Sequence, residues 1–257
     1  MFENIYDFGA NRGQNLKYFL NYTENVIAVE PIPELFEEIS NGFKEEIISK
    51  KLNVLNLAIV TDEQIKTTKF YINEEKNWES TLLKKNSYNE IEVPAATPKQ
   101  IFDIYGYPDL LKIDVENFDI DVLKYLKQKK ILPTYLIFEV QNPETLDFVL
   151  SNFEYKYYNI VLGHRVSIDY GDKHLENHSS GPIFTDLKFK WVRKKIIYFY
   201  FKICNYGWID VHCTDQMLNN KKSIGIARTI YYLIKDKIYR LFNPYINRVK
   251  GKFKLIH

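Results

Sequence analysis

Apolar and polar positions along most of the chain follow two periods, one typical of strands and one typical of helices. Short apolar runs predict strands at residues 4–8, 26–29, 52–59, 110–114, 134–140 and 155–162. Between these runs, apolar residues recur at the spacing of a helix face over residues 14–20, 34–43, 118–128 and 143–150. Such alternation predicts βαβ units and a mostly parallel, doubly wound sheet of the α/β class.

Other segments give mixed signals. Residues 69–72 predict an edge or hairpin strand, and residues 73–88 a loop whose residues 78–81 are candidates to contact a cofactor or acceptor. A short helix is predicted at residues 97–105, a loop at 163–187, helix or strand at 191–204, and a last strand at 208–213. An amphipathic helix is predicted at residues 223–242, ended by Asn243-Pro244 because proline lacks the N–H that a helix needs.

Composition narrows the class of protein. A hydrophobic content of 46% suffices for a buried core, and two cysteines are too few for a disulfide framework. The apolar stretches all fall short of the roughly 18 residues that a membrane span needs, and we identify no signal peptide. These features predict a cytoplasmic protein.

The net charge of +2 is unevenly distributed. Residues 219–257 hold ten Lys or Arg and one acid, Asp236, so this segment carries +9 and the remainder −7. Its apolar residues near one stripe are Ile226, Ile230, Leu233, Ile234 and Leu241. We expect this C-terminal extension to pack on the α/β domain with a solvated basic side, and peripheral contact with a membrane or a protein partner is the open alternative.

A glycine-containing turn joins the first predicted strand to the first helix, with the sequence Asp7-Phe8-Gly9-Ala10-Asn11-Arg12-Gly13. Glycine lets backbone N–H groups approach a ligand closely. A dinucleotide-binding turn would have glycine in place of Asn11, whose side chain would crowd a pyrophosphate. Asp7, at the end of the strand, instead suits a cofactor with an ammonium group and a sulfonium. The turn therefore favours S-adenosylmethionine.

An acidic residue, Glu30, ends the second predicted strand. A carboxylate in that position can accept hydrogen bonds from both hydroxyls of a ribose. The turn and Glu30 together predict a nucleoside-binding half of the fold. The predicted cofactor-binding residues are Asp7, Gly9, Ala10, Asn11, Gly13, Glu30, Pro31 and Ala58.

Three stretches resemble the FkbM-type S-adenosylmethionine-dependent methyltransferases. Residues 6–13 are close to the family's D-x-G-A-N-x-G, residues 26–33 resemble its strand ending in E-P-x-P, and residues 111–118 resemble its K-I-D-V-E-G. The resemblance runs to about residue 213. It implies a Rossmann-like methyltransferase domain, which we place at residues 1–218, with residues 219–257 as the extension. Asn117 replaces the family's glycine, and asparagine is a residue that tolerates a positive φ.

The resemblance also implies methylation of a hydroxyl on a sugar, a glycan or a related metabolite. Ligands of open α/β sheets bind at the carboxyl ends of the strands, where Asp114 would lie nearest the transferred methyl group. Lys112 lies on the same face of its strand and would keep Asp114 ionised, so these two are the catalytic candidates. Weaker candidates for a base are His164, His174 and His178. No metal is predicted, although oxygen ligands for Mg²⁺ would be available from Asp114, Glu139 and Asn142.

Two other functions stay open. The chain would be a non-catalytic scaffold if only the fold were kept and the basic extension bound a membrane or a partner. It would be a nucleic-acid methyltransferase if the same charge bound phosphates. The intact turn, Glu30 and Asp114 argue against a scaffold. An N-P-P-Y-type motif for base methylation is missing, so no nucleic-acid partner is expected.

Overall fold

A computed structural model describes residues 2–140, 142–171, 180–204, 209–216, 218 and 223–253. Within them, the main sheet has the strand order β3-β2-β1-β7-β8-β10-β9. Its strands are β1 (Ile5–Phe8), β2 (Val26–Val29), β3 (Leu52–Leu55), β7 (Leu110–Ile113), β8 (Tyr135–Glu139), β9 (Tyr157–Leu162) and β10 (Ile209–Thr214). Most neighbours are parallel, as predicted, and only β10 runs antiparallel to both β8 and β9 in this sheet.

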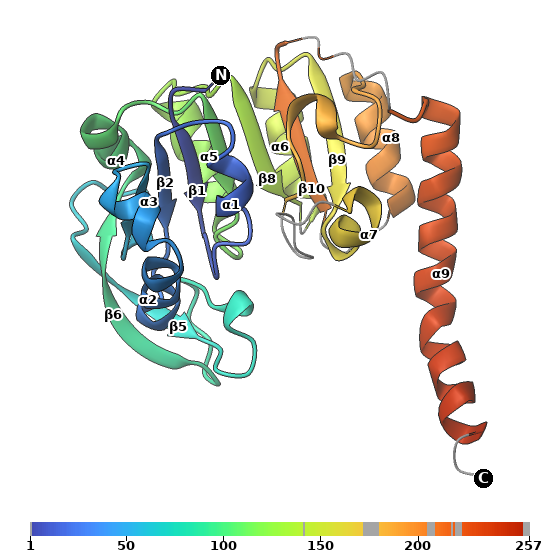
Figure 1. Cartoon of the computed structure of the whole chain (residues 1–257), viewed down its shortest axis with the longest axis horizontal. Helices are drawn as coiled ribbons and strands as arrows, with labels where there is room; N and C mark the ends of the chain where they lie inside the picture. The colour runs from blue at the N-terminus through green and yellow to red at the C-terminus, as the bar shows by residue number, and fades with distance from the viewer. Residues whose placement is uncertain are drawn as a thin grey trace.

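Helices cover both faces of this sheet (Figure 1). They are α1 (Leu16–Phe19), α2 (Pro33–Gly42), α3 (Lys44–Ile48), α4 (Pro98–Tyr105), α5 (Asp119–Gln128), α6 (Pro143–Asn152), α7 (Val166–Tyr170) and α8 (Lys194–Cys204). Because side chains alternate along a strand, Tyr6 and Phe8 of β1 join one hydrophobic core and Ile5 joins the other. The strands are therefore apolar on both faces, as a covered parallel sheet requires.

The strand order reverses between β1 and β7. From β1 the chain continues outward through β2 and β3, whereas β7 lies on the other side of β1 and leads to β8. In open α/β sheets such a reversal leaves a crevice at the carboxyl ends of the two central strands. The crevice here is bordered by the turn after β1 and by the residues that follow β7.

A second, small sheet has the order β4-β6-β5, formed by β4 (Ala58–Ile59), β5 (Thr67–Ile72) and β6 (Asn89–Ala96). The predicted strand at residues 52–59 is therefore two strands. Between them, the Asn56 side-chain amide donates to the carbonyl oxygens of Glu30 and Pro31, at 2.9 and 3.1 Å, which fixes the change of direction. The polar strand β6 was not predicted, because its exposed face carries charged residues.

The C-terminal part differs from the prediction in two places: the predicted loop at residues 163–187 contains the short helix α7, and the last helix is longer than predicted. Residues 191–204, which fitted helix or strand, contain α8, and the predicted last strand is β10. The amphipathic helix α9 (Ile226–Phe253) continues past Asn243-Pro244, so the predicted end at residue 242 is wrong. A proline removes one helical hydrogen bond, and here the loss does not end the helix. The lower part of α9 stands away from the domain (Figure 1).

Candidate functional site

The turn after β1 is built on backbone conformations that few residues adopt. Gly9, Asn11 and Gly13 have φ values of 80°, 51° and 79°. The N–H groups of Gly9 and Ala10 both donate to the carbonyl oxygen of Val29 at 3.0 Å, so the turn is tied to the end of β2.

Gly9 is required for a contact within the protein. A Cβ atom at this position would lie 1.8 Å from the carbonyl oxygen of Asp114, at the end of β7. The expectation that the glycine makes room for the ligand is therefore corrected, because the first obstacle is the protein backbone. Gly9 lets the turn and the end of β7 close together, and its backbone still lines the cavity between them.

Both carboxyl oxygens of Glu30, the predicted ribose acceptor, accept hydrogen bonds from backbone N–H groups. One carboxylate oxygen accepts from the N–H of Asn11 at 2.8 Å, and the other accepts from the N–H of Ile32 at 2.9 Å. A carboxylate oxygen can accept more than one hydrogen bond, so both keep acceptor capacity on the side of the cavity. Burial raises the pKa of Glu30 to about 8, although the two N–H groups lower it.

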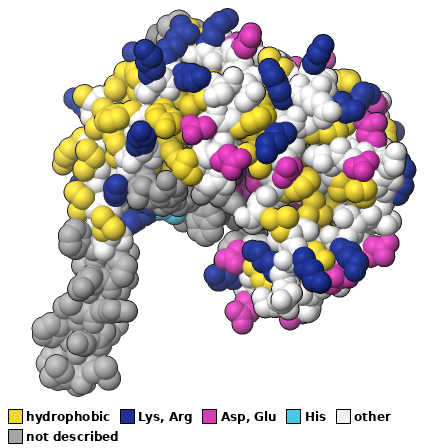
Figure 2. Space-filling view, turned by 180° about the vertical axis from the view of Figure 1, so that it is seen from behind, with side chains coloured by type: hydrophobic (Ala, Val, Ile, Leu, Met, Phe, Trp, Pro, Cys, Tyr) yellow, Lys and Arg dark blue, Asp and Glu magenta, His cyan; other side chains and the backbone are white. Residues whose placement is uncertain are grey.

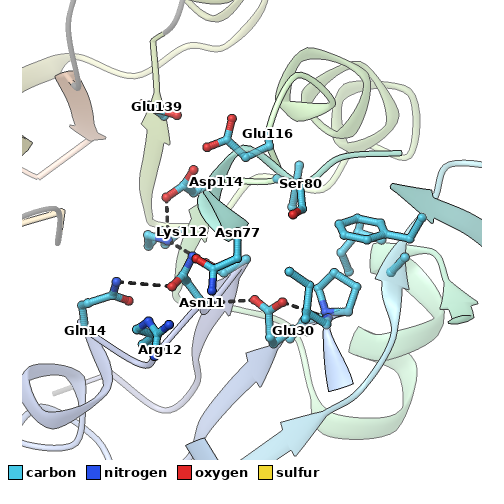
Figure 3. A pocket seen from close by; sticks show the side chains of 18 of the residues that line it. Asn11, Arg12, Gln14, Glu30, Asn77, Ser80, Lys112, Asp114, Glu116 and Glu139 are labelled. Carbon is cyan, nitrogen blue, oxygen red and sulfur yellow. Dashed lines mark hydrogen bonds and ion pairs between the residues drawn. The ribbon is translucent and has the colours of Figure 1, made fainter. Parts of the chain in front are cut away.

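A cavity of about 370 Å³ opens at this edge of the sheet and has two chemically different ends (Figure 3). The end near Glu30 is largely apolar, and its lining includes Ile32, Ala58, Ile59, Phe70 and Leu82. The other end is acidic, and its lining includes Asp114, Glu116, Glu139 and Asp210. Volumes of this size are usual for small-molecule sites.

Lys112 lies between the turn and the acidic end of the cavity. Its Nζ is 2.9 Å from Asp7 Oδ1 and 3.3 Å from Asp114 Oδ2, and it donates to the Gly9 carbonyl oxygen at 3.2 Å. Asp7 and Lys112 are opposite each other in the β1–β7 register, and both are buried. Burial alone would lower the pKa of Lys112, but the charges of Asp7 and Asp114 raise it overall. Lys112 is therefore charged.

The acidic end brings together side chains from three strands. Carboxylate oxygens of Asp114, Glu116 and Glu139 lie within 4.8 Å of one another. Glu116 and Asn117 have φ values of 40° and 67°, so the positive φ expected at Asn117 is present. Asp210, from β10, is buried, and burial together with the charge of Asp114 raises its pKa to about 7.

The structure does not bring every predicted residue to the cavity. Gly9, Asn11, Glu30, Pro31, Ala58, Lys112 and Asp114 line it, whereas Asp7, Ala10 and Gly13 are not among its lining residues. Asp7 is fully buried beside Lys112, so direct contact with a cofactor is not supported by its position.

The candidate metal ligand Asn142 and the candidate histidine bases have different outcomes. The Asn142 side chain accepts from the Thr145 N–H at 3.1 Å and caps α6. The possible set of metal ligands therefore contains Glu116 in place of Asn142. His164 contacts Asp236 of α9 at 3.4 Å. His174 and His178 lie outside the described residues.

Several lining residues were missed by the sequence reasoning. Asn77, next to the predicted contact loop of residues 78–81, is one of them, whereas Ser80 belongs to that predicted loop and does line the cavity. Asp210 had no distinguishing signal, because it lies near the start of its strand. As β10 is antiparallel, that start lies at the edge where the parallel strands end.

The sheet order, the antiparallel β10 and the cavity at the carboxyl ends of the central strands define a Rossmann-like methyltransferase fold. The chain belongs to the FkbM methyltransferase family, since the methyltransferase FkbM domain matches residues 7–161. Membership in this family implies S-adenosylmethionine as the methyl donor. No curated protein matches the chain.

Solved structures of low sequence identity were also found. The FkbM methyltransferase of Methylobacillus flagellatus KT is 16% identical, with a TM-score of 0.41, over 62% of this chain and 39% of that one. A precorrin-6Y C5,15-methyltransferase of Geobacter metallireducens GS-15 is 11% identical, with a TM-score of 0.34, over 62% and 64%. A putative O-methyltransferase of Klebsiella pneumoniae is 8% identical, with a TM-score of 0.40, over 84% and 74%. The chain thus spans less than two thirds of the first two structures.

The lining of the cavity matches the parts of S-adenosylmethionine. The carboxyl group of Glu30 is the acceptor that the sequence predicts for the ribose hydroxyls, and the apolar residues near it suit the flat adenine ring. The acidic end suits the positive charges of the ammonium and sulfonium groups. The residues present therefore fit this donor.

The contact between Gly9 and Asp114 generates a prediction about stability. Gly9→Ala should lower the free energy of unfolding by more than about 3 kcal/mol, because the new methyl group overlaps the Asp114 carbonyl oxygen. Gly42→Ala is the matched control, since a Cβ there meets nothing within 4 Å. Urea unfolding measures both, and equal midpoints for the two variants would contradict this interpretation.

Glu30 generates a prediction about cofactor affinity. Above about pH 8, where the carboxyl group of Glu30 is ionised, Glu30→Ala should weaken binding of S-adenosylmethionine by on the order of 1.5–3 kcal/mol, because the ribose loses its charged acceptor. The exposed Glu34 on the next helix provides the control variant Glu34→Ala, which should bind as the wild type does. Calorimetric titration measures the affinities. Tight binding of NAD in place of S-adenosylmethionine would refute the assignment of the cavity.

The raised pKa of Glu30 also predicts a pH dependence. Between its ordinary pKa of 4.5 and about 8, the folded chain keeps a proton that the unfolded chain releases. The free energy of unfolding of the cofactor-free protein should therefore fall as the pH rises through this range. Glu30→Gln cannot ionise, so its stability should fall less, as denaturant titrations across the range would measure. An equal decline in both proteins would show that Glu30 is not the group involved.

Proposed function

We propose that the chain is an S-adenosylmethionine-dependent O-methyltransferase that acts on a hydroxyl of a sugar, a glycan or a related metabolite. The observation that carries the proposal is the position of Asp114. Its side chain is 30% exposed, whereas Lys112, 3.3 Å away, is almost fully buried. Asp114 is thus an accessible carboxylate at the carboxyl end of a central strand, held beside a charged ammonium group and facing the cavity.

The two ends of the cavity have different roles in the proposed reaction. When bound, S-adenosylmethionine supplies a methyl group that its sulfonium has already activated. Glu30 and the apolar lining hold the nucleoside end. The acidic end orients the acceptor, and such alignment supplies up to ~7–11 kcal/mol in favourable intramolecular cases.

Asp114 is assigned the role of general base. It accepts the proton of the acceptor hydroxyl, directly or through one water, while that oxygen forms its bond to the methyl carbon. S-adenosylmethionine, held by Glu30 and the apolar lining, would supply the methyl group and keep the electron pair of the carbon–sulfur bond. The Lys112 ammonium group, 3.3 Å from Asp114 Oδ2, holds the Asp114 side chain in place.

The charges of the cavity support a neutral, hydroxyl-rich acceptor. Asp114, Glu116 and Glu139 can each accept hydrogen bonds from hydroxyl groups, and Asn77 and Ser80 add polar atoms across the cavity (Figure 3). A phosphate or carboxylate acceptor would meet these carboxylates at short range and be repelled. A sugar or similar polyol presents the hydrogen-bond donors that these carboxylates can bind.

A cytoplasmic location remains a prediction.

The role of Asp114 is tested by replacing it with its amide. Asp114→Asn should leave the affinity for S-adenosylmethionine within a few-fold and lower turnover by roughly 10²–10⁴, because the shape is kept and the base is lost. Asp103→Asn is the matched control, since Asp103 pairs with Lys99 on an exposed helix away from the cavity. Transfer of a labelled methyl group to a panel of neutral saccharides measures turnover.

Other outcomes would revise the proposal in defined ways. Unchanged turnover in Asp114→Asn would show that alignment alone suffices. Labelling of amines with no labelling of hydroxyl compounds would refute O-methylation. Loss of activity on chelation, restored by Mg²⁺, would make Asp114 a metal ligand beside Glu116 and Glu139, whose oxygens lie close enough to share an ion.

A further inference from the structure

Helix α9 is fixed to the domain through one face. Thr229, Leu233 and Asp236 on that face are buried, and Arg240 continues it one turn further. Asp236 is 2.9 Å from Arg240 and 3.4 Å from both Arg165 and His164. The only acid of the C-terminal extension is therefore turned inward, where it contacts two guanidinium groups and one imidazole.

A second group of contacts strengthens this attachment. The Tyr232 hydroxyl donates to Asp169 Oδ2 at 2.7 Å and accepts from Arg165 Nε at 2.6 Å, and the Lys188 ammonium lies 4.0 Å from the centre of its ring. Gly163, two residues before Arg165, lines the cavity. This part of α9 is held against the domain by specific contacts.

The opposite face of α9 is apolar and exposed. Tyr231, Ile234, Ile238 and Leu241 are 69%, 43%, 49% and 64% exposed, and we refer to these four residues as the outer stripe. Their spacing of three, four and three residues places them on one side of the helix. The expected apolar stripe is therefore corrected: Leu233 packs inward, whereas Ile234 and Leu241 point outward.

Basic residues flank the outer stripe. Arg228 and Lys235 are exposed on one side of it, and Lys237 is half-buried on the other. The neighbouring helix α8, which contacts α9, adds exposed Tyr198 and Phe199. Hydrophobic side chains and Lys or Arg are interspersed on the side of the molecule from which α9 leaves (Figure 2). Within residues 223–241, this outward surface carries no carboxylate, because Asp236 is buried.

We propose that the outer stripe lies on an anionic lipid surface and attaches the enzyme to it. Apolar side chains of such a helix enter the boundary between headgroups and acyl chains, and the flanking cations bind anionic headgroups. Among the described residues, no helix combines the length and apolarity needed to cross a bilayer. The attachment is therefore along the surface of the membrane.

The charge of the extension favours a membrane over a second copy of the chain. Two extensions packed stripe to stripe would bring together segments of +9 each, which repel. Nucleic acid would satisfy the cations but leave the aliphatic centre of the stripe, Ile234 and Ile238, without an apolar partner. An anionic membrane satisfies both the charge and the apolar area.

Vesicle sedimentation with the full chain tests this proposal. The protein should sediment with vesicles that contain phosphatidylglycerol, bind pure phosphatidylcholine vesicles weakly, and bind less at high salt, because salt screens the cations. Ile234→Glu/Ile238→Glu should weaken binding by roughly tenfold or more. The matched control is Ile48→Glu/Ile104→Glu, which places the same substitutions at exposed positions of α3 and α4 and should bind as the wild type does.

Three results would overturn the proposal. They are failure of the wild type to bind anionic vesicles, equal loss of binding in both double variants, and equal binding to neutral and anionic vesicles. Sedimentation equilibrium supplies a further check, since a wild-type dimer that Ile234→Glu/Ile238→Glu converts to a monomer would assign the stripe to a second copy. Circular dichroism melts show that both variants are folded, so a loss of binding has a clear cause.

Discussion

The buried ammonium group of Lys112 is the interaction on which the site depends. It contacts Asp7 on β1, the Gly9 carbonyl in the turn and Asp114 after β7, and so joins the end of β1 and its turn to a segment that is distant in sequence. Without this cation, Asp7 would be a buried carboxylate with no opposite charge, which is strongly unfavourable. The same charge that stabilises Asp7 inside the sheet also contacts Asp114 at the cavity.

The close approach of Gly9 to the end of β7 has a related effect. It brings Glu30, proposed to hold the nucleoside, and Asp114, proposed as the base, to opposite ends of one cavity. Both groups rest on rigid strand ends, Glu30 through two backbone N–H groups and Asp114 through Lys112. Catalysis by alignment needs this kind of rigid support.

Local patterns predicted the parts of the structure that are decided locally. The period of apolar residues gave the parallel strands, and the acid after β2 identified Glu30. The role of Asp7 could not be inferred in this way, because its partner Lys112 is set by the register of two strands more than a hundred residues apart. Asp210 reaches the cavity only because β10 is antiparallel. The direction in which each apolar residue of α9 points depends on contacts with Arg165 and Asp169, which the helical period alone does not reveal.

The most direct test of the account is a crystal structure of the chain with S-adenosylhomocysteine. We expect both ribose hydroxyls within hydrogen-bond distance of Glu30, the adenine among the apolar residues near Ala58, and the sulfur directed toward Asp114. Asp7 should remain paired with Lys112 and make no contact with the ligand. A nucleoside bound away from Glu30, or with its sulfur directed away from the acidic end, would contradict the arrangement of donor and base proposed for this methyltransferase.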